Sequence, residues 1–295
     1  MRKLMLIINP AAGRGGFRTL FGEAMLRLSE GGFQTSLYFT KGPGEATELV
    51  KKYASGYDTV ACVGGDGTLS EVVSGLMQIP NPPPLGYIPM GTSNDVATTL
   101  GLPKNDTVGA AKRIVEGNAH PYDIGGFGEN EYFAYIAAFG AFTEVSYVTP
   151  QDQKKALGHL AYILQGASLL GKIGKIHTRI EYDDGVFEDD LLYGSMSNST
   201  SVAGIVRLRD EMVSIGDGKS ELVLVKDPVT PDAYGDLAGS ILSRTFENQN
   251  LQILHTTKAK FIFDRPVAWT RDGEAGGEHT VAELCNYHAA IQFIF

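Results

Sequence analysis

A glycine-rich segment in the first third of the chain has the composition of a phosphate-binding loop. Gly64-Gly65-Asp66-Gly67-Thr68 follows a short apolar run, residues 59–63, and precedes apolar residues at helical spacing. Glycines let the backbone approach an anion closely, and the free N–H groups at the start of a helix can bind that anion. Asp66 could hold Mg²⁺ through water or orient a reacting phosphate. The alternative interpretation is a plain strand-to-helix turn with an aspartate cap.

Two further polar loops have the same placement between an apolar run and a helical pattern. Asn9-Pro10-Ala11-Ala12-Gly13-Arg14-Gly15-Gly16 resembles a phosphate-binding turn but lacks the Lys-Ser/Thr of a P-loop. Arg14 could meet phosphate oxygens. Gly91-Thr92-Ser93-Asn94-Asp95 is equally rich in residues that cap helices. A flexible connection and a simple helix cap are the alternatives, but three such loops after three strands of one sheet favour a shared ligand.

A fourth element lies far along the chain. Arg271-Asp272-Gly273-Glu274 places two carboxylates around a glycine, and such a pair could supply a general base and a metal-binding or orienting group. The alternative is a hairpin turn, because Asp-Gly is a preferred turn pair.

The elements that must position these residues change character along the sequence. Up to about residue 120, apolar runs predict strands at 3–8, 35–39, 59–63 and 85–89. Helical spacing predicts helices at 17–30, 45–53, 69–77, 96–100 and 107–116. This alternation predicts an α/β domain with a doubly wound, mostly parallel sheet, in which ligands bind beyond the carboxyl ends of the strands.

The second half of the chain predicts mainly antiparallel strands. Short alternating runs occupy residues 132–138, 175–182, 186–192, 221–225, 251–255, 258–263, 267–271 and 288–295, with helices at 155–170 and 232–243. Asp183-Asp184-Gly185 predicts a hairpin turn. We therefore expect an α/β domain over residues 1–124 and a β-sandwich or partial barrel over residues 125–295.

Composition excludes several functional classes. The 295 residues carry a net charge of −9, and hydrophobic residues make up 43%. An acidic chain lacks the field for general nucleic-acid binding. It also argues against tight adhesion to anionic lipid, with a local basic patch as the alternative. Cys62 and Cys285 predict no disulfide framework, and the histidines show no metal-binding spacing. The cysteine pattern fits a reducing cytoplasm, and no apolar stretch approaches the roughly 20 residues of a membrane span. We therefore expect a cytoplasmic protein that is peripheral to the membrane.

Taken together and in this order, the four motifs make the sequence recognisable. Asn9–Gly13, GGDGT at 64–68, GTSND at 91–95 and DGE at 272–274 resemble the bacterial diacylglycerol kinase and YegS-like lipid kinases, a family also similar to sphingosine and ceramide kinases. GGDGT alone is shared with NAD kinases and phosphofructokinases, whereas GTxND and the late DGE narrow the likeness to lipid kinases. The likeness spans nearly the whole chain.

The resemblance implies an ATP-binding first domain, a lipid-binding second domain and catalysis in the cleft between them. Asp66, Asp95 and Asp123 would support Mg²⁺ and phosphate positioning. The general base would be Glu274 or Asp272, with Glu274 slightly favoured. The implied ATP contacts are Asn9, Pro10, Ala11, Ala12, Gly13, Thr40, Gly65, Asp66, Gly67, Thr68, Leu69, Ser70, Glu71 and Thr92.

The family also has a structural Mg²⁺ site in its second domain, which Ser214-Ile215-Gly216-Asp217-Gly218-Lys219 resembles. Asp217 would be the side-chain ligand, and the carbonyls of Ser214 and Lys219 would complete the site. Gly216 stands where the family often has an acidic residue, so only one carboxylate is left. A plain Asp-Gly turn is the alternative.

The function implied is an ATP- and Mg²⁺-dependent kinase that phosphorylates a lipid hydroxyl, converting diacylglycerol to phosphatidic acid. Such an enzyme would visit the membrane surface transiently. Residues 154–172, apolar with basic ends, could lie on that surface, line an acyl pocket or simply pack on the sheet. A kinase for a soluble acceptor (NAD or a sugar phosphate), a non-catalytic nucleotide-binding protein and a homodimer all stay open.

Overall fold

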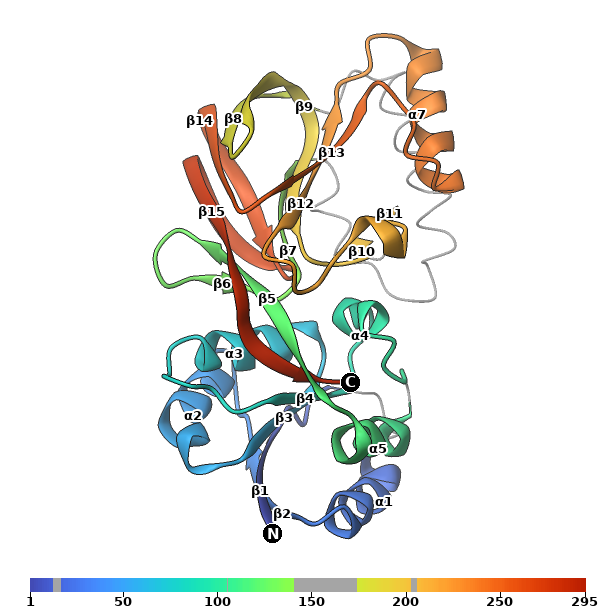
Figure 1. Cartoon of the computed structure of the whole chain (residues 1–295). Helices are drawn as coiled ribbons and strands as arrows, with labels where there is room; N and C mark the ends of the chain where they lie inside the picture. The colour runs from blue at the N-terminus through green and yellow to red at the C-terminus, as the bar shows by residue number, and fades with distance from the viewer. Residues whose placement is uncertain (13–16, 105, 141–173, 203–205) are drawn as a thin grey trace.

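The computed structural model describes residues 1–12, 17–104, 106–140, 174–202 and 206–295. The expected helix at 155–170 and the loop residues Gly13 and Arg14 lie outside the described residues. Figure 1 shows two halves stacked end to end, with the N-terminal half below and the C-terminal half above.

Four parallel strands form the centre of the N-terminal half. β1 (Arg2–Ile8) lies between β2 (Phe33–Phe39) and β3 (Thr59–Gly64), and β3 also pairs with β4 (Leu85–Pro89). Leu4–Ile8 are all fully buried, which is the pattern of a parallel strand covered on both faces.

The helices of this half lie on both sides of that sheet. α1 (Phe17–Glu30) and α5 (Thr107–Glu116) share a core with Leu4, Leu6 and Ile8. α2 (Glu45–Tyr53) and α3 (Asp66–Leu76) share a core with Met5 and Ile7. The short turn η1 (Ala54–Gly56) and α4 (Asp95–Thr99) complete the half.

The C-terminal half is rich in antiparallel strands, as the sequence predicts. β8 (Ile176–Tyr182) and β9 (Gly185–Ser197) form a hairpin whose two-residue turn is Asp183-Asp184, so the predicted turn is confirmed. The long strands β9 and β14 (Lys258–Arg271) are joined at one end by β8 and at the other by β7 (Ile136–Gly140). This ring of strands encloses an aromatic core that includes Phe139, Phe261 and Trp269.

The remaining elements extend this half on one side. β12 (Ser220–Lys226) pairs with β9 and with β13 (Leu251–Thr256). The helix α7 (Pro231–Ser243) lies at the outer edge, on the right in Figure 1. The short elements are β6 (Tyr132–Phe133), β10 (Ser201–Val202), β11 (Val206–Arg207) and the turn η4 (Asp210–Met212).

Two strands belong to both halves. β15 (Glu274–Ile294) begins against β14, then pairs with β5 (Ala119–Phe127), and finally reaches β4 at Phe293. Its pairing with β5 is interrupted between Tyr287 and Ile291. β5 and β15 therefore join the strands of both halves into one continuous sheet, and residue 124 lies within β5 rather than in a linker.

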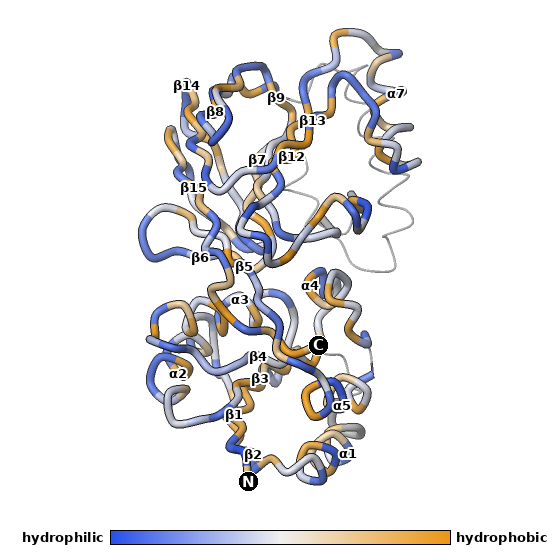
Figure 2. Tube along the Cα trace, viewed as in Figure 1, coloured by the Kyte–Doolittle hydropathy of each residue, from blue (hydrophilic) through white to orange (hydrophobic). Residues whose placement is uncertain are grey.

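Pairing explains where the structure differs from the sequence pattern. Residues 258–263 and 267–271 are one strand, β14, although its register with β15 shifts between Ile262 and Val267. β5 was not predicted because Pro121 and Gly125-Gly126 interrupt its apolar pattern. In Figure 2 hydrophobic residues concentrate along β1, β3 and β4, while polar residues dominate the exposed turns.

Candidate active site

Two of the predicted loops are in direct backbone contact. A β-carbon on Gly91 would lie 2.5 Å from the Cα of Gly65, so only glycine fits at this contact. Asn94 has a positive φ of 50° and binds Gly91 twice, accepting from its N–H at 2.9 Å and donating to its C=O at 2.9 Å. The loops after β3 and β4 are therefore held side by side at the carboxyl ends of their strands.

The loop after β1 joins them through Asn9. Asn9 Nδ2 donates to Thr68 Oγ1 at 2.9 Å, and Asn9 Oδ1 accepts from the N–H of Ala11 at 2.9 Å. One amide thus shapes its own turn and binds the first turn of α3. The convergence of the three glycine-containing loops is confirmed for their described residues.

These loops line a cavity of about 710 Å³. Its wall is completed by the start of α2 and by the turn between β14 and β15. The lining residues are Asn9, Pro10, Ala11, Ala12, Thr40, Lys41, Gly42, Pro43, Thr47, Gly65, Gly67, Thr68, Ser70, Glu71, Ser74, Gly91, Tyr132, Arg271, Glu274 and Ala275.

Most of the predicted nucleotide contacts are among these residues, but three described ones, Asp66, Leu69 and Thr92, are not. Leu69 is fully buried in the core of the N-terminal half, and Thr92 is exposed and does not line the cavity. Sequence reasoning gave no role to Lys41, Tyr132 or Arg271. Only Arg271 had a local signal, since it directly precedes the DGE motif.

Asp66 has a carboxylate oxygen that no protein group satisfies. It is the first residue of α3, and its Oδ1 is buried with no hydrogen-bond partner. Burial, and then the charge of Asp95, raise the pKa of Asp66 to about 7, although the backbone N–H groups of Asp95 and Asn94 lower it. A buried carboxylate oxygen without a partner beside a second carboxylate fits Mg²⁺, a cation that takes oxygen ligands.

The two acids of the DGE motif have different environments. Asp272 and Gly273 form the two-residue turn between β14 and β15, with φ values of 48° and 84°. The buried Asp272 carboxylate accepts from the N–H groups of Ala134, Tyr135 and Ile136 at 2.6, 3.0 and 3.1 Å. Burial raises the pKa of Asp272, and a hydrogen bond from Ser70 lowers it.

Glu274, in contrast, lies open to the cavity. Its side chain is exposed, and Oε1 lies 3.1 Å from where a β-carbon on Gly67 would stand. The carboxylate thus faces the GGDGT loop from the opposite wall. A glycine-rich wall that could bind a phosphate donor, with a carboxylate on the opposite wall, is an arrangement suited to phosphoryl transfer to a hydroxyl.

Comparison with known proteins identifies the family. The sequence model of the diacylglycerol kinase catalytic domain matches residues 3–127. A diacylglycerol kinase of Bacillus subtilis (strain 168) is 32% identical over 278 residues, covering 94% of this chain and 91% of that protein. One from Staphylococcus aureus (strain bovine RF122 / ET3-1) is 38% identical over 288 residues, covering 94% and 87%.

The chain belongs to the diacylglycerol kinase family. The kinase also shares its fold with a crystal structure of a diacylglycerol kinase from Bacillus anthracis str. Sterne, at 25% identity and a TM-score of 0.77, covering 100% of this chain and 97% of that one. The resemblance inferred from the four motifs is confirmed, as is the expectation of a lipid kinase.

Glu71 of the kinase binds protein groups on the cavity wall. Its Oε1 accepts from the N–H of Gly44 at 2.8 Å and its Oε2 from the N–H of Ala46 at 3.1 Å. These N–H groups lie at the start of α2, where a negative charge is stabilising. Glu71 therefore connects α3 to α2 and fixes the segment that contains Thr40 and Lys41.

Asp123 lies away from the cavity of the kinase, and its carboxylate is saturated. Oδ2 accepts from the N–H of Gly218 at 2.7 Å and from Asn286 Nδ2 at 3.0 Å, while Oδ1 accepts from the N–H of Ala289 at 2.6 Å and lies 3.1 Å from His288 Nδ1. The side chain is completely buried. Asp123 thus binds the 214–219 loop to β5 and β15.

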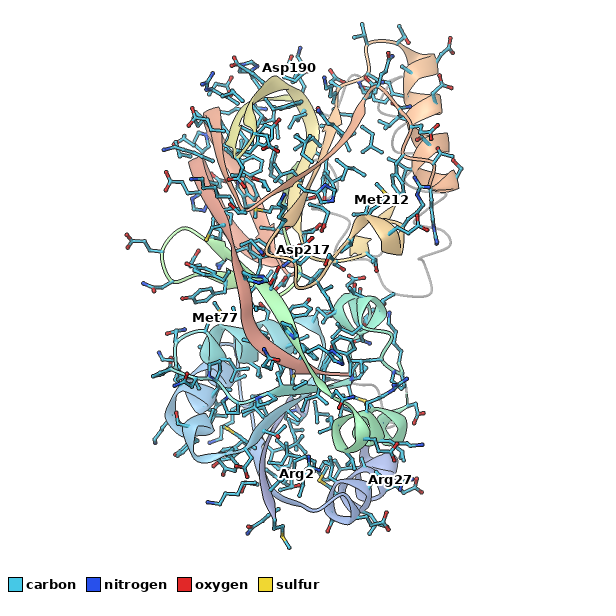
Figure 3. All side chains as sticks on the ribbon, viewed as in Figure 1. Arg2, Arg27, Met77, Asp190, Met212 and Asp217 are labelled. Atoms are coloured by element: carbon cyan, nitrogen blue, oxygen red, sulfur yellow. The ribbon has the colours of Figure 1, made fainter. Side chains whose placement is uncertain are left out.

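The 214–219 loop lies in the middle of the molecule, where Figure 3 labels Asp217 near β5 and β15. A β-carbon on Gly216 would stand 2.9 Å from the carbonyl oxygen of Pro121, so a side chain at this position would require the loop to move. Asp217 Oδ1 accepts from the N–H of Lys219 at 3.0 Å. Among the described residues no cluster of three or more His, Cys, Asp or Glu has metal-binding geometry.

Sequence reasoning missed an acid beside this loop. Glu221, on β12, is buried, and its Oε2 has no hydrogen-bond partner. Burial, and then the charge of Asp217, raise the pKa of Glu221 to about 8. An unpartnered buried carboxylate next to Asp217 fits a bound cation at this loop. Its place in the alternating pattern of β12 gave no signal of this.

In the described part of the kinase, no helix combines the length and the apolar character that crossing a membrane requires.

Proposed function

We propose that the chain is an ATP- and Mg²⁺-dependent lipid kinase that transfers the γ-phosphate of ATP to a lipid hydroxyl, converting diacylglycerol to phosphatidic acid. The observation that carries the proposal is the position of Glu274, which faces the glycine loops across one cavity. Membership of the family supports the reaction type.

The donor site would be the glycine-lined side of the cavity. The backbone of Gly65, Gly67 and Gly91 is free of β-carbons that would hold an anion away. The first turn of α3 points its N–H groups toward this space. Residues 9–13 and Thr40 would complete the nucleotide site, and Asn9 and Glu71 hold these walls in place.

Asp66 and Asp95 would hold Mg²⁺, with the unpartnered Asp66 Oδ1 as the clearest ligand atom. When bound, Mg²⁺ would neutralise charge on the phosphate oxygens. A second Mg²⁺ would be held by Asp217 and the carbonyls of Ser214 and Lys219, close to the unpartnered oxygen of Glu221. This second ion would stabilise the 214–219 loop.

Glu274 would act as the general base. As the acceptor oxygen forms its bond to the γ-phosphorus, the bond from that phosphorus to the β–γ bridging oxygen breaks and ADP leaves. The hydroxyl proton passes to the Glu274 carboxylate. Asp272 is bound by three backbone N–H groups, so its role would be to hold the turn that presents Glu274.

The two halves would divide the substrates between them. Residues 1–124 carry the glycine loops, and residues 125–295 carry the DGE turn and would bind the lipid. An insoluble acceptor implies that the enzyme works at the membrane surface from the cytoplasm and then leaves it.

The test is transfer of label from [γ-³²P]ATP to an acceptor panel of diacylglycerol, phosphatidylglycerol, a sphingoid base, NAD and a sugar phosphate. We expect labelled phosphatidic acid, with Mg²⁺ required. Labelling of NAD or the sugar phosphate alone would replace the proposal with a soluble-acceptor kinase. ATP binding without labelling of any acceptor would support a non-catalytic nucleotide-binding protein.

A further inference from the structure

The described lining of the nucleotide cavity contains little positive charge for a ligand as anionic as ATP. Its charged residues are Lys41, Glu71, Arg271 and Glu274. The carboxylates of Asp66 and Asp272 lie close by, since their charges interact. A triphosphate in this cavity therefore needs each available cation, and Arg271 is the one that the described part of the second half contributes to the lining.

Strand pairing places Arg271 beside the proposed base. Arg271 and Glu274 are the paired residues that flank the Asp272-Gly273 turn, and directly opposed residues project from the same face of a hairpin, with β-carbons about 5 Å apart. Both side chains line the cavity. The acceptor hydroxyl must meet the γ-phosphate next to Glu274, so the guanidinium lies at the γ-phosphate end.

The Arg271 side chain is held by neighbouring residues, but one of its N–H donors has no hydrogen-bond acceptor. Its Nη1 lies 3.3 Å from Glu131 Oε2, and its Cζ lies 5.6 Å from the centre of the Phe127 ring. The side chain is 22% exposed, and its Nε is buried with no hydrogen-bond partner. A buried N–H donor without an acceptor is unfavourable, and a planar guanidinium matches the geometry of phosphate oxygens.

We propose that Arg271 binds the terminal phosphate of the nucleotide and gives the enzyme its preference for ATP over ADP. Glu131 and Phe127 hold the guanidinium while the phosphate is absent. One hairpin then supplies both the base and the cation to the γ-phosphate. This inference rests on the proposed function, because it assumes that the cavity binds ATP.

The experiment compares the Kd values for ATP and ADP, without lipid and with Mg²⁺, by isothermal titration calorimetry. In Arg271→Gln we expect ATP binding to weaken by roughly 10- to 100-fold, the range of a lost charge-assisted hydrogen bond, and ADP binding to change less than about threefold. The matched control is Arg179→Gln. Arg179 is also ion-paired with glutamates but lies on β8, among exposed side chains.

Arg271→Met keeps an unbranched side chain against Phe127 and removes the charge, so it gives the same test if Arg271→Gln does not fold. A purely structural role would lower the melting temperature of either variant and leave the ratio of the two Kd values unchanged. An unchanged ratio in a folded variant overturns the inference and leaves the proposed function standing. Failure of the wild-type protein to bind ATP overturns both.

Discussion

Two aspartates of this molecule, the half-buried Asp66 and the fully buried Asp123, have very different environments. Asp123 makes four contacts from its two oxygens to donors of the 214–219 loop and β15, whereas Asp66 keeps a buried oxygen without a partner and a raised pKa. Folding has satisfied Asp123, and it has left Asp66 in an environment that only a ligand can complete. In this molecule, the aspartate whose carboxylate lacks hydrogen-bond donors is the candidate for ligand binding. The aspartate whose carboxylate has all its donors stabilises the fold.

The largest effect should come from Asp66. Replacement by Asn should lower kcat by roughly 10³-fold or more, since the charge proposed to hold Mg²⁺ is lost. The melting temperature should stay level or rise, because the remaining amide oxygen can still accept from the backbone N–H groups of Asp95 and Asn94, and repulsion with Asp95 disappears. Steady-state kinetics and a thermal scan measure the two quantities. A folded variant with wild-type kcat would refute the assignment of Asp66.

Glu274→Gln should reduce kcat by roughly 10²- to 10⁴-fold, the usual contribution of a general base, with little change in ATP affinity. Asp272→Asn is the matched variant on the same turn. It should chiefly reduce the free energy of unfolding, since a carboxamide can satisfy fewer of the three N–H donors. If Asp272→Asn loses kcat while Glu274→Gln keeps it, the two roles must be exchanged.

Asp123→Asn tests the other side of the comparison. The amide cannot accept from the N–H groups of both Gly218 and Ala289, so urea unfolding should show a loss of about 2–4 kcal/mol. The kcat of the folded protein should stay within about tenfold of wild type. The family resemblance assigns Asp123 to the catalytic metal network, and a loss of kcat as large as that of Asp66→Asn would support that role instead.

The smallest effect is a pH dependence. The pKa of Asp66 is about 7 in the folded protein and about 3.9 in an unfolded chain. Between these values the unfolded state has released this proton and the folded state has not, so the free energy of unfolding contributed by this group falls as pH rises from about 4 to 7. Because Asp66 is only half-buried, we expect about 1–2 kcal/mol.

Urea midpoints at pH 4.5 and 7.5, without divalent cations, measure this change. Asp66→Asn should make the slope shallower than in wild type over this range, and the raised pKa values of Glu221 and Asp272 should maintain the rest of it. Parallel curves for the two proteins would show that the Asp66 carboxylate titrates normally in the folded protein.

The features that depend on neighbouring residues could be predicted from the sequence. The helices at 45–53 and 107–116 and the strand at 85–89 have the predicted bounds, because their periodicity is a property of neighbouring residues. The three glycine loops could also be placed at one sheet edge, since the carboxyl ends of parallel strands share that edge.

What depends on long-range pairing could not be predicted. The Asp272 carboxylate binds N–H groups from residues 134–136, a contact across more than 130 residues. Spacing alone therefore could not separate its role from that of Glu274. Arg271 was overlooked for the same reason, because its place beside Glu274 follows from the register of the hairpin.

The path of β15 constrains how the protein is made. Ile291–Ile294 pair with residues 119–122, and Phe293 meets Leu85 at the edge of the parallel sheet. Domains usually fold in order as they leave the ribosome. Here the N-terminal half receives β15 only after residues 274–294 have been synthesised, so its strand pairing cannot be completed before most of the C-terminal half has been made.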